Sequence, residues 1–177
     1  PDTEGRGILT DDPKPSHRYL GCYHNVDENC IEYEVKDFMK ECCNKYCALA
    51  GASTTELVLS KTPFLDESTL EEGDHLNPGE LNEEASSILM KILYGARMAR
   101  YDLLRATCAL ASKITKWTRA CDKQLYKLVC YIHSTLDYVL KGTVGDPMDK
   151  LSLKLFADAD FAGCESTSRS TSGVFLC

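Results

Sequence analysis

The chain has 177 residues, a hydrophobic content of 44% and a formal net charge of −7 at pH 7. This length suffices for one domain or two small ones, and no apolar run is long enough to span a membrane. No secretory signal pattern opens the sequence, so the ten cysteines are expected to be reduced thiols of a cytoplasmic or nuclear protein rather than a disulfide framework.

Charge is distributed unevenly along the chain. Residues 1–90 carry 7 Lys and Arg against 19 Asp and Glu, a net charge of −12, whereas residues 91–150 carry 11 against 5, a net charge of +6. A chain that is acidic overall is a poor nonspecific binder of nucleic acid. Its basic middle region can nevertheless line a path for phosphates.

The first part of the chain is expected to contain a tail, short strands and one helix. Residues 1–17 are rich in Pro, Gly and charge, which is typical of a flexible tail. Short strands are expected at Tyr19–Tyr23 and at about Cys30–Tyr33. A helix is expected over Glu34–Ala50, because apolar residues recur there at helical spacing and Gly51 follows as a stop.

The middle of the chain predicts a surface loop and then helices. Residues 66–84 are acidic and contain Gly and Pro, which indicates an exposed loop. The region 85–141 is expected to be helical, with amphipathic stretches at Glu84–Ala99, Asp102–Thr118 and Asp122–Ser134. The second stretch has a candidate buried stripe made of Leu103, Leu104, Cys108, Ala111, Ile114 and Thr115. A short strand is expected at Tyr138–Leu140, and residues 142–150 are expected to be a linker.

The last segment, residues 151–177, has the pattern of a β-hairpin with acids at a strand end. Side chains alternate from Leu151 to Asp160, so Asp158 and Asp160 lie on one face of the strand. Mg²⁺ prefers hard oxygen ligands and usually takes one or two carboxylates from a protein. Two such ions can clamp the oxygens of a phosphodiester. The acids are therefore candidate Mg²⁺ ligands, although an acid pair can also simply end a strand on its solvated side.

The segment from Ala157 to Gly163, Ala-Asp-Ala-Asp-Phe-Ala-Gly, together with the Ser-Thr-Ser-Gly run that ends at Gly173, resembles the start of the ribonuclease H domain of Ty1/copia-type retrotransposon Pol polyproteins. In this sequence Phe161 stands where that family more often has Trp, and Cys164 replaces a frequent acid.

Earlier segments resemble the same family in the same order. Arg18–His24 is similar to the segment that opens the reverse-transcriptase thumb. Ile88–Leu103 resembles the connection helix and its Arg-Pro-Asp-Ile step, with Tyr101 in place of proline. Leu125–Tyr138 is similar to the helix and strand that precede ribonuclease H.

The resemblance implies an α+β fold, with a helix-rich thumb and connection followed by the first β-hairpin of a truncated ribonuclease H-like domain. The thumb-like part covers residues 18–65, the connection 85–141 and the hairpin 151–177. Asp158 would be the first catalytic, Mg²⁺-binding carboxylate, and Asp160 an adjacent ligand. The implied partners are an RNA–DNA hybrid or template–primer and the rest of the Pol polyprotein.

The same resemblance implies that this chain has no activity by itself. No Tyr-x-Asp-Asp polymerase motif occurs in it. The later ribonuclease H carboxylates of the family would follow Cys177, so the chain is expected to be a fragment of the enzyme.

Basic residues of the middle region are candidate contacts to a nucleic-acid backbone. Trp117 lies near them and is either a stacking side chain beside the duplex or a core residue beneath a solvated helix face. The candidate ligands are Lys113, Lys116, Arg119, Lys123 and Lys127.

Two other functions stay open at this stage. One is a noncatalytic helical interaction module derived from a retroelement. The other is a structural zinc domain, since Cys22, His24, Cys30, Cys42, Cys43 and Cys47 lie close together in sequence. Zinc takes four N or S ligands, commonly from Cys-x(2–4)-Cys pairs. Only Cys43 and Cys47 have that spacing, and thiols packed beneath the helix are the competing explanation.

Overall fold

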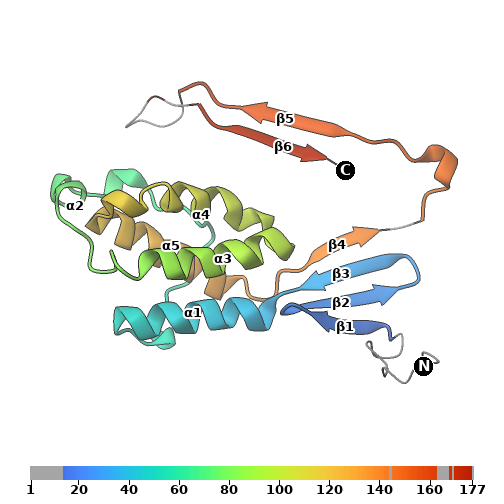
Figure 1. Ribbon diagram of the computed structural model, residues 1–177, viewed down its shortest axis with the longest axis horizontal. Helices are drawn as coiled ribbons and strands as arrows, with labels where there is room; N and C mark the ends of the chain where they lie inside the picture. The colour runs from blue at the N-terminus through green and yellow to red at the C-terminus, as the bar shows by residue number, and fades with distance from the viewer. Residues whose placement is uncertain (1–13, 144, 163–167, 169, 177) are drawn as a thin grey trace, which may run out of the picture. The chain divides into compact units, whose positions relative to one another are not determined.

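The computed structural model describes residues 14–143, 145–162, 168 and 170–176. The chain forms two compact units, the first of which ends at Thr143. The first unit combines helices with a four-stranded sheet, and the second contains a two-stranded sheet (Figure 1). The expected α+β class is thereby confirmed. Among the described residues, no helix has both the length and the apolar character needed to cross a membrane.

The larger sheet is antiparallel and joins the two ends of the first unit. Its strands lie in the order β1 (Ser16–Tyr19), β2 (Cys22–Asp27), β3 (Cys30–Glu34) and β4 (Leu140–Thr143). Tyr33 of β3 pairs with Leu140 of β4. All the helices of the unit therefore lie in sequence between two neighbouring strands.

Three expectations about this sheet are wrong in their boundaries. The strand expected at Tyr19–Tyr23 is interrupted by a turn at Leu20 and Gly21, where both residues have positive φ. Strand β1 starts at Ser16, inside the expected tail; residues 1–13 lie outside the described part of the chain. The strand expected at Tyr138–Leu140 is displaced to β4, which occupies the first residues of the expected linker.

Four longer helices form the body of the first unit. They are α1 (Lys36–Ala50), α3 (Ala85–Ala99), α4 (Leu104–Ala111) and α5 (Arg119–Ser134). Helices α1, α3 and α5 confirm the three helices expected over Glu34–Ala50, Glu84–Ala99 and Asp122–Ser134. In each of them the apolar stripe has enough turns to define a buried face.

The helix expected over Asp102–Thr118 is present only in part, as α4. A 3-10 turn at Tyr101–Leu103 precedes α4, and another at Ile114–Lys116 follows it. The expected stripe is also confirmed only in part: Leu103 is buried and Leu104, Ala111 and Ile114 pack against the core, but Cys108 and Thr115 are exposed. Further buried positions are Ala106, Thr107 and Leu110.

The core lies where α1 packs against α3 and α5, and where α4 packs against the same two helices. Gly95 permits the close approach of α3 to α1, since a Cβ added there would lie only 2.1 Å from Cε of Met39. Met39, Leu89 and Leu125 are completely buried. Burying a side chain of this size contributes roughly 1.5–3 kcal/mol, so this contact area supplies much of the stability of the unit.

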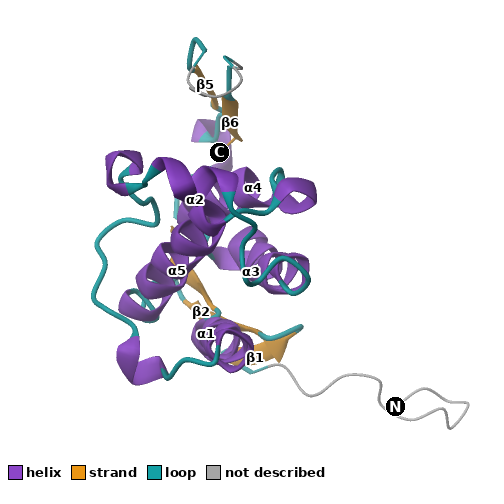
Figure 2. Ribbon diagram, turned by 90° about the vertical axis from the view of Figure 1, so that its left-hand side faces the viewer, coloured by secondary structure: helices purple, strands orange, loops and turns teal. Residues whose placement is uncertain are grey.

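The acidic segment 66–84 is more ordered than an exposed loop. It contains a 3-10 helix at Glu67–Thr69 and the short helix α2 (Glu72–Leu76), and it buries Asp74 and Leu81. Backbone hydrogen bonds attach its later part to the residues around the start of α5. Figure 2 shows α2 beside α5, and these two helices are in contact.

The second unit contains the expected hairpin. Strand β5 (Leu155–Ala159) pairs antiparallel with β6 (Ser172–Leu176), and Asp158 lies opposite Gly173. Strand β5 is shorter than the run from Leu151 to Asp160 that alternation predicted, because regular pairing begins only at Leu155.

Candidate functional site

Asp158 lies in strand β5 and its side chain is exposed. It makes no hydrogen bond or ion pair with any residue that the structure describes. Its neighbour across the ladder is Gly173, which has no side chain to cover the carboxylate. The carboxylate is therefore open to a ligand that approaches this face of the hairpin.

Asp160 has a different environment, although it follows Asp158 by only two residues. Its backbone N–H donates to the carbonyl oxygen of Thr171 at 3.0 Å, and its carboxylate accepts a hydrogen bond from the Thr171 N–H. Asp160 thus helps to close the hairpin. This role occupies Oδ1 of Asp160, and no described residue bonds to its other carboxylate oxygen.

The two acids fit part of a magnesium site. The exposed carboxylate of Asp158 and the carboxylate of Asp160, which accepts from Thr171, are hard oxygen ligands of the kind that Mg²⁺ takes, usually one or two from a protein. Among the described residues, no three His, Cys, Asp or Glu side chains are grouped so that they could hold a metal ion. Asp158 and Asp160 would therefore share such an ion with water, phosphate or further carboxylates.

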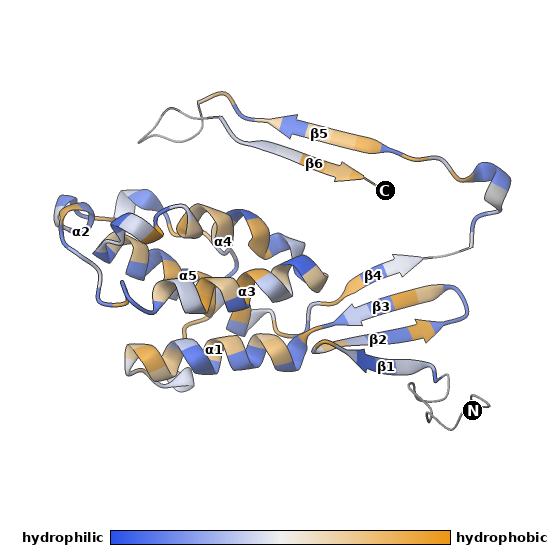
Figure 3. Cartoon of the chain, in the orientation of Figure 1, coloured by the Kyte–Doolittle hydropathy of each residue, from blue (hydrophilic) through white to orange (hydrophobic). Residues whose placement is uncertain are grey.

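Apolar side chains cover both faces of the hairpin. Phe156 pairs with Phe175 on the face of Asp158, while Leu155 pairs with Leu176 on the other face. All four are more than half exposed, and Figure 3 shows the hydrophobic start of β5 beside the hydrophobic end of β6. An isolated two-stranded hairpin is at best marginally stable in water, so these faces are suited to packing against further helices or another sheet.

The predicted nucleic-acid ligands all lie in the first unit, around the start of α5. Lys113 precedes the 3-10 turn Ile114–Lys116, and Lys116 is the last residue of that turn, so the two do not lie on the long helix that was expected there. Arg119, Lys123 and Lys127 follow one another at intervals of one turn along α5. These five residues are called the basic cluster below.

Two members of the basic cluster are engaged within the chain. Nζ of Lys123 lies 2.6 Å from Oδ2 of Asp74 in α2. Nζ of Lys113 donates to Oε1 of Gln124 at 3.3 Å. Lys116, Arg119 and Lys127 are not fully buried, and none of them forms an ion pair with a side chain that the structure describes.

Trp117 is a core residue and does not offer a stacking face. Its side chain is 3% exposed, and its Nε1–H donates to Oδ1 of Asp122 at 2.7 Å. The same carboxylate accepts the N–H groups of Glu80 at 2.6 Å and Leu81 at 3.3 Å. Asp122 thereby joins the acidic segment to the start of α5 and neutralises part of the positive charge there.

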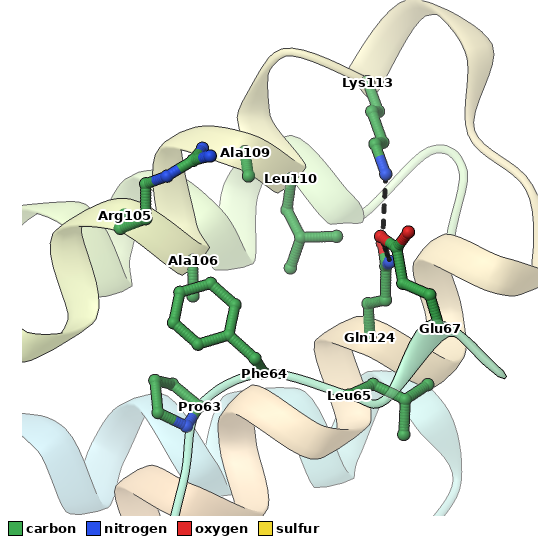
Figure 4. Close-up of a pocket in the computed structure, with 10 residues that line it drawn as sticks. All are labelled: Pro63, Phe64, Leu65, Glu67, Arg105, Ala106, Ala109, Leu110, Lys113 and Gln124. Atoms are coloured by element: carbon green, nitrogen blue, oxygen red, sulfur yellow. Dashed lines mark hydrogen bonds between the residues drawn. The ribbon is translucent and has the colours of Figure 1, made fainter. Parts of the chain in front are cut away.

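A pocket of about 150 Å³ lies beside the basic cluster (Figure 4). Phe64, Ala106 and Leu110 give it an apolar surface, and Arg105 and Lys113 place cationic groups on its walls. Glu67 accepts a hydrogen bond from Nε2 of Gln124 at 3.4 Å on the same side. Sequence reasoning missed Phe64 and Arg105, since neither belongs to a motif or a charge run.

Arg100 forms a buried network at the end of α3. Its guanidinium donates to both carboxylate oxygens of Asp102, at 3.0 and 2.8 Å, and to the carbonyl and hydroxyl oxygens of Thr135, at 2.9 and 2.7 Å. Tyr131 adds a hydrogen bond to Asp102 at 2.9 Å. Burial alone would raise the pKa of Asp102, but the hydrogen bonds and charge of Arg100 outweigh it and lower the pKa. The segment that resembles the Arg-Pro-Asp-Ile step therefore has a structural role here.

The cysteines of the proposed zinc region are part of the core. Cys22, Cys42, Cys43 and Cys47 are buried, and Sγ of Cys43 donates to the carbonyl oxygen of Val129 at 3.9 Å. Burial raises the pKa of both Cys42 and Cys43 to about 12. These thiols are protonated at neutral pH and pack as small apolar groups.

Comparisons of the chain with protein-family models, with curated proteins and with solved structures find no match.

Proposed function

We propose that this chain is a segment of a retrotransposon Pol polyprotein of the Ty1/copia type. The helical unit would be the connection that contacts a template–primer or an RNA–DNA hybrid. The hairpin would be the first part of a ribonuclease H-like domain. The observation that carries this proposal is the position of Asp158, an exposed carboxylate on the first strand of an antiparallel hairpin, opposite a glycine.

In the parent enzyme, Asp158 would hold Mg²⁺ with help from Asp160. The ion would stabilise the developing charge on the phosphodiester and lower the pKa of the attacking water. Two-metal hydrolysis needs more carboxylates than these, so the rest of the Pol polyprotein would have to supply them. The apolar faces of the hairpin support this view, because further strands and helices would bury them.

The helical unit supports the proposal through its charge. The basic cluster gathers five cationic residues at the junction of α4 and α5, in a chain that is acidic overall. Contacts of Lys and Arg with phosphates position a duplex without reading its sequence. This is the kind of contact that a connection between two active sites requires.

The test uses a fluorescent RNA–DNA hybrid with Mg²⁺ present. The chain should bind the hybrid with an affinity that falls as salt rises, and Lys113→Gln/Lys116→Gln/Lys127→Gln should weaken binding by roughly tenfold or more. It should not cleave the RNA strand. Turnover that Asp158→Asn abolishes would contradict the need for outside carboxylates, and absence of binding at low salt would contradict the nucleic-acid role.

A noncatalytic interaction module is the second candidate. The observation in its favour is that the first unit has its own continuous core built from α1, α3, α4 and α5. A stable, monodisperse unit with no affinity for the hybrid would favour this function over the first.

A further inference from the structure

We propose that residues 66–76, here called the acidic strap, cover part of the basic cluster and compete with nucleic acid for it. This inference concerns the regulation of the binding surface and rests on the nucleic-acid role proposed above. The strap carries five acids and no Lys or Arg. The basic cluster carries five cations, so the strap and the cluster have equal numbers of opposite charges.

Side chains alone connect the acidic strap to α5. Oδ2 of Asp74 pairs with Nζ of Lys123 at 2.6 Å, and Oε1 of Glu67 accepts from Gln124 at 3.4 Å. Gln124 in turn accepts from Lys113 at 3.3 Å. The strap therefore pairs directly with Lys123 from α2 and reaches Lys113 indirectly, through Gln124, from the preceding 3-10 helix. It occupies the charge of Lys123, which would otherwise meet a phosphate.

Residues 77–81, which follow the acidic strap, are attached far more firmly. The N–H of Gly79 donates to the carbonyl of Trp117 at 3.2 Å, and the N–H of Arg119 donates to the carbonyl of Asn77 at 3.1 Å. Asp122 adds its bonds to Glu80 and Leu81. Residues 77–81, called the anchor below, thus stay attached to the start of α5 when the strap moves away from the basic cluster.

Little apolar surface would be lost if the acidic strap were displaced. Asp74 is its only buried residue, while Leu76 is 76% exposed. Solvent reaches one side of the ion pair, since the Lys123 side chain is 48% exposed, whereas the Asp74 side chain is 10% exposed. Water and salt screen a pair that has such an exposed partner, and a polyanion with closely spaced phosphates can therefore replace the carboxylates of the strap.

The experiment measures hybrid affinity by fluorescence anisotropy at fixed salt, using the full chain. Asp74→Asn should tighten binding by about three- to tenfold, because it frees Lys123 for a phosphate. The matched control is Glu41→Gln, which frees Lys91 from its 3.2 Å pair on α1 and α3. It raises the net charge equally and should change affinity less than twofold.

A second variant and a second measurement guard against a folding defect in Asp74→Asn. Glu67→Gln/Glu72→Gln changes two exposed acids of the strap and should also tighten binding. Hydrogen exchange should speed up in residues 67–76 when the hybrid binds, while the anchor stays protected.

Three results are decisive. Equal effects of Asp74→Asn and Glu41→Gln would overturn competition by the strap, as would unchanged or slower exchange in residues 67–76. Either of these results overturns only the competition by the strap. The proposed function stays intact if the wild type binds the hybrid and the triple lysine variant does not. If neither wild type nor any strap variant binds, both proposals fail.

Discussion

Removing the carboxylate of Asp102 should strongly destabilise the first unit. The Arg100 side chain is only 2% exposed, and Asp102 receives two of its four hydrogen bonds. In Asp102→Ala the guanidinium charge stays buried with Thr135 as its remaining hydrogen-bond partner. Breaking a buried pair in this way costs about 3–5 kcal/mol.

The lower end of that range applies here. The Asp102 side chain is 33% exposed, so water can enter and partly replace it. We expect a loss of about 3 kcal/mol, against a total stability on the order of 5–15 kcal/mol for a domain. Replacing both partners, in Arg100→Met/Asp102→Leu, should restore much of the loss because no buried charge is left.

Urea unfolding at pH 7 measures these differences through the fluorescence of Trp117, the only tryptophan. Glu41→Ala is the control, since it breaks a largely exposed pair and should cost less than about 1 kcal/mol. A loss below about 1 kcal/mol for Asp102→Ala, or a double variant as unstable as the sum of its single variants, would refute this reasoning.

Three further predictions follow from the packing and the titrating groups. Gly79→Ala should lower the free energy of unfolding by roughly 2 kcal/mol or more, because its Cβ would lie 2.7 Å from the carbonyl oxygen of Thr118. The control is Gly73→Ala, whose Cβ would have its nearest contact at 3.6 Å. Thermal melts of both variants should show Gly73→Ala as neutral or stabilising. Lys123 lowers the pKa of Asp74 in the folded chain, and Arg100 lowers the pKa of Asp102 against the opposing effect of burial. Both carboxylates therefore stabilise the folded state above the unfolded pKa of about 4. This stabilisation is lost as pH falls through the folded pKa values. The urea midpoint should therefore drop below about pH 4, and an unchanged drop in Asp102→Asn would contradict this assignment. With Cys164 and Cys177 replaced by Ser, a thiol reagent at pH 8 should modify exposed Cys108 quickly, and Cys42 and Cys43 only on unfolding. Rapid labelling of Cys43 in the folded chain would show that its thiol is not buried.

The sequence predicted helices better than it predicted long-range pairing. Helices α1, α3 and α5 could be predicted because local periodicity defines a buried face. The pairing of Tyr33 with Leu140 has no local signal, since it depends on how the intervening helices fold. The boundaries of β4 and of the expected linker were displaced for the same reason.

Polar side chains account for buried positions in and before α4 that the sequence did not predict. Thr107 is completely buried because its hydroxyl donates to the carbonyl of Leu103 at 2.8 Å. Arg100 is buried because Asp102 and Thr135 satisfy its guanidinium. A count of apolar residues assigns such side chains to the surface, since their partners appear only in the folded chain.

The candidate site was predictable only in part. Alternation placed Asp158 and Asp160 together at the end of a strand, but it gave no sign that Thr171 would engage Asp160. Charge counting found the basic cluster, but it did not predict that Asp74 and Glu67 would reach it. Contacts between segments distant in sequence decide which charges remain free.

The central claim is that Asp158 holds a divalent ion, and NMR with Mn²⁺ as a paramagnetic substitute for Mg²⁺ tests it most directly. Hard oxygen ligands bind both ions, and Mn²⁺ broadens amide signals near its site. We expect broadening at Asp158 and at Gly173 across the ladder, abolished by Asp158→Asn and only weakened by Asp160→Asn. Broadening at Gly173 that persists in Asp158→Asn, or that never occurs, would contradict it.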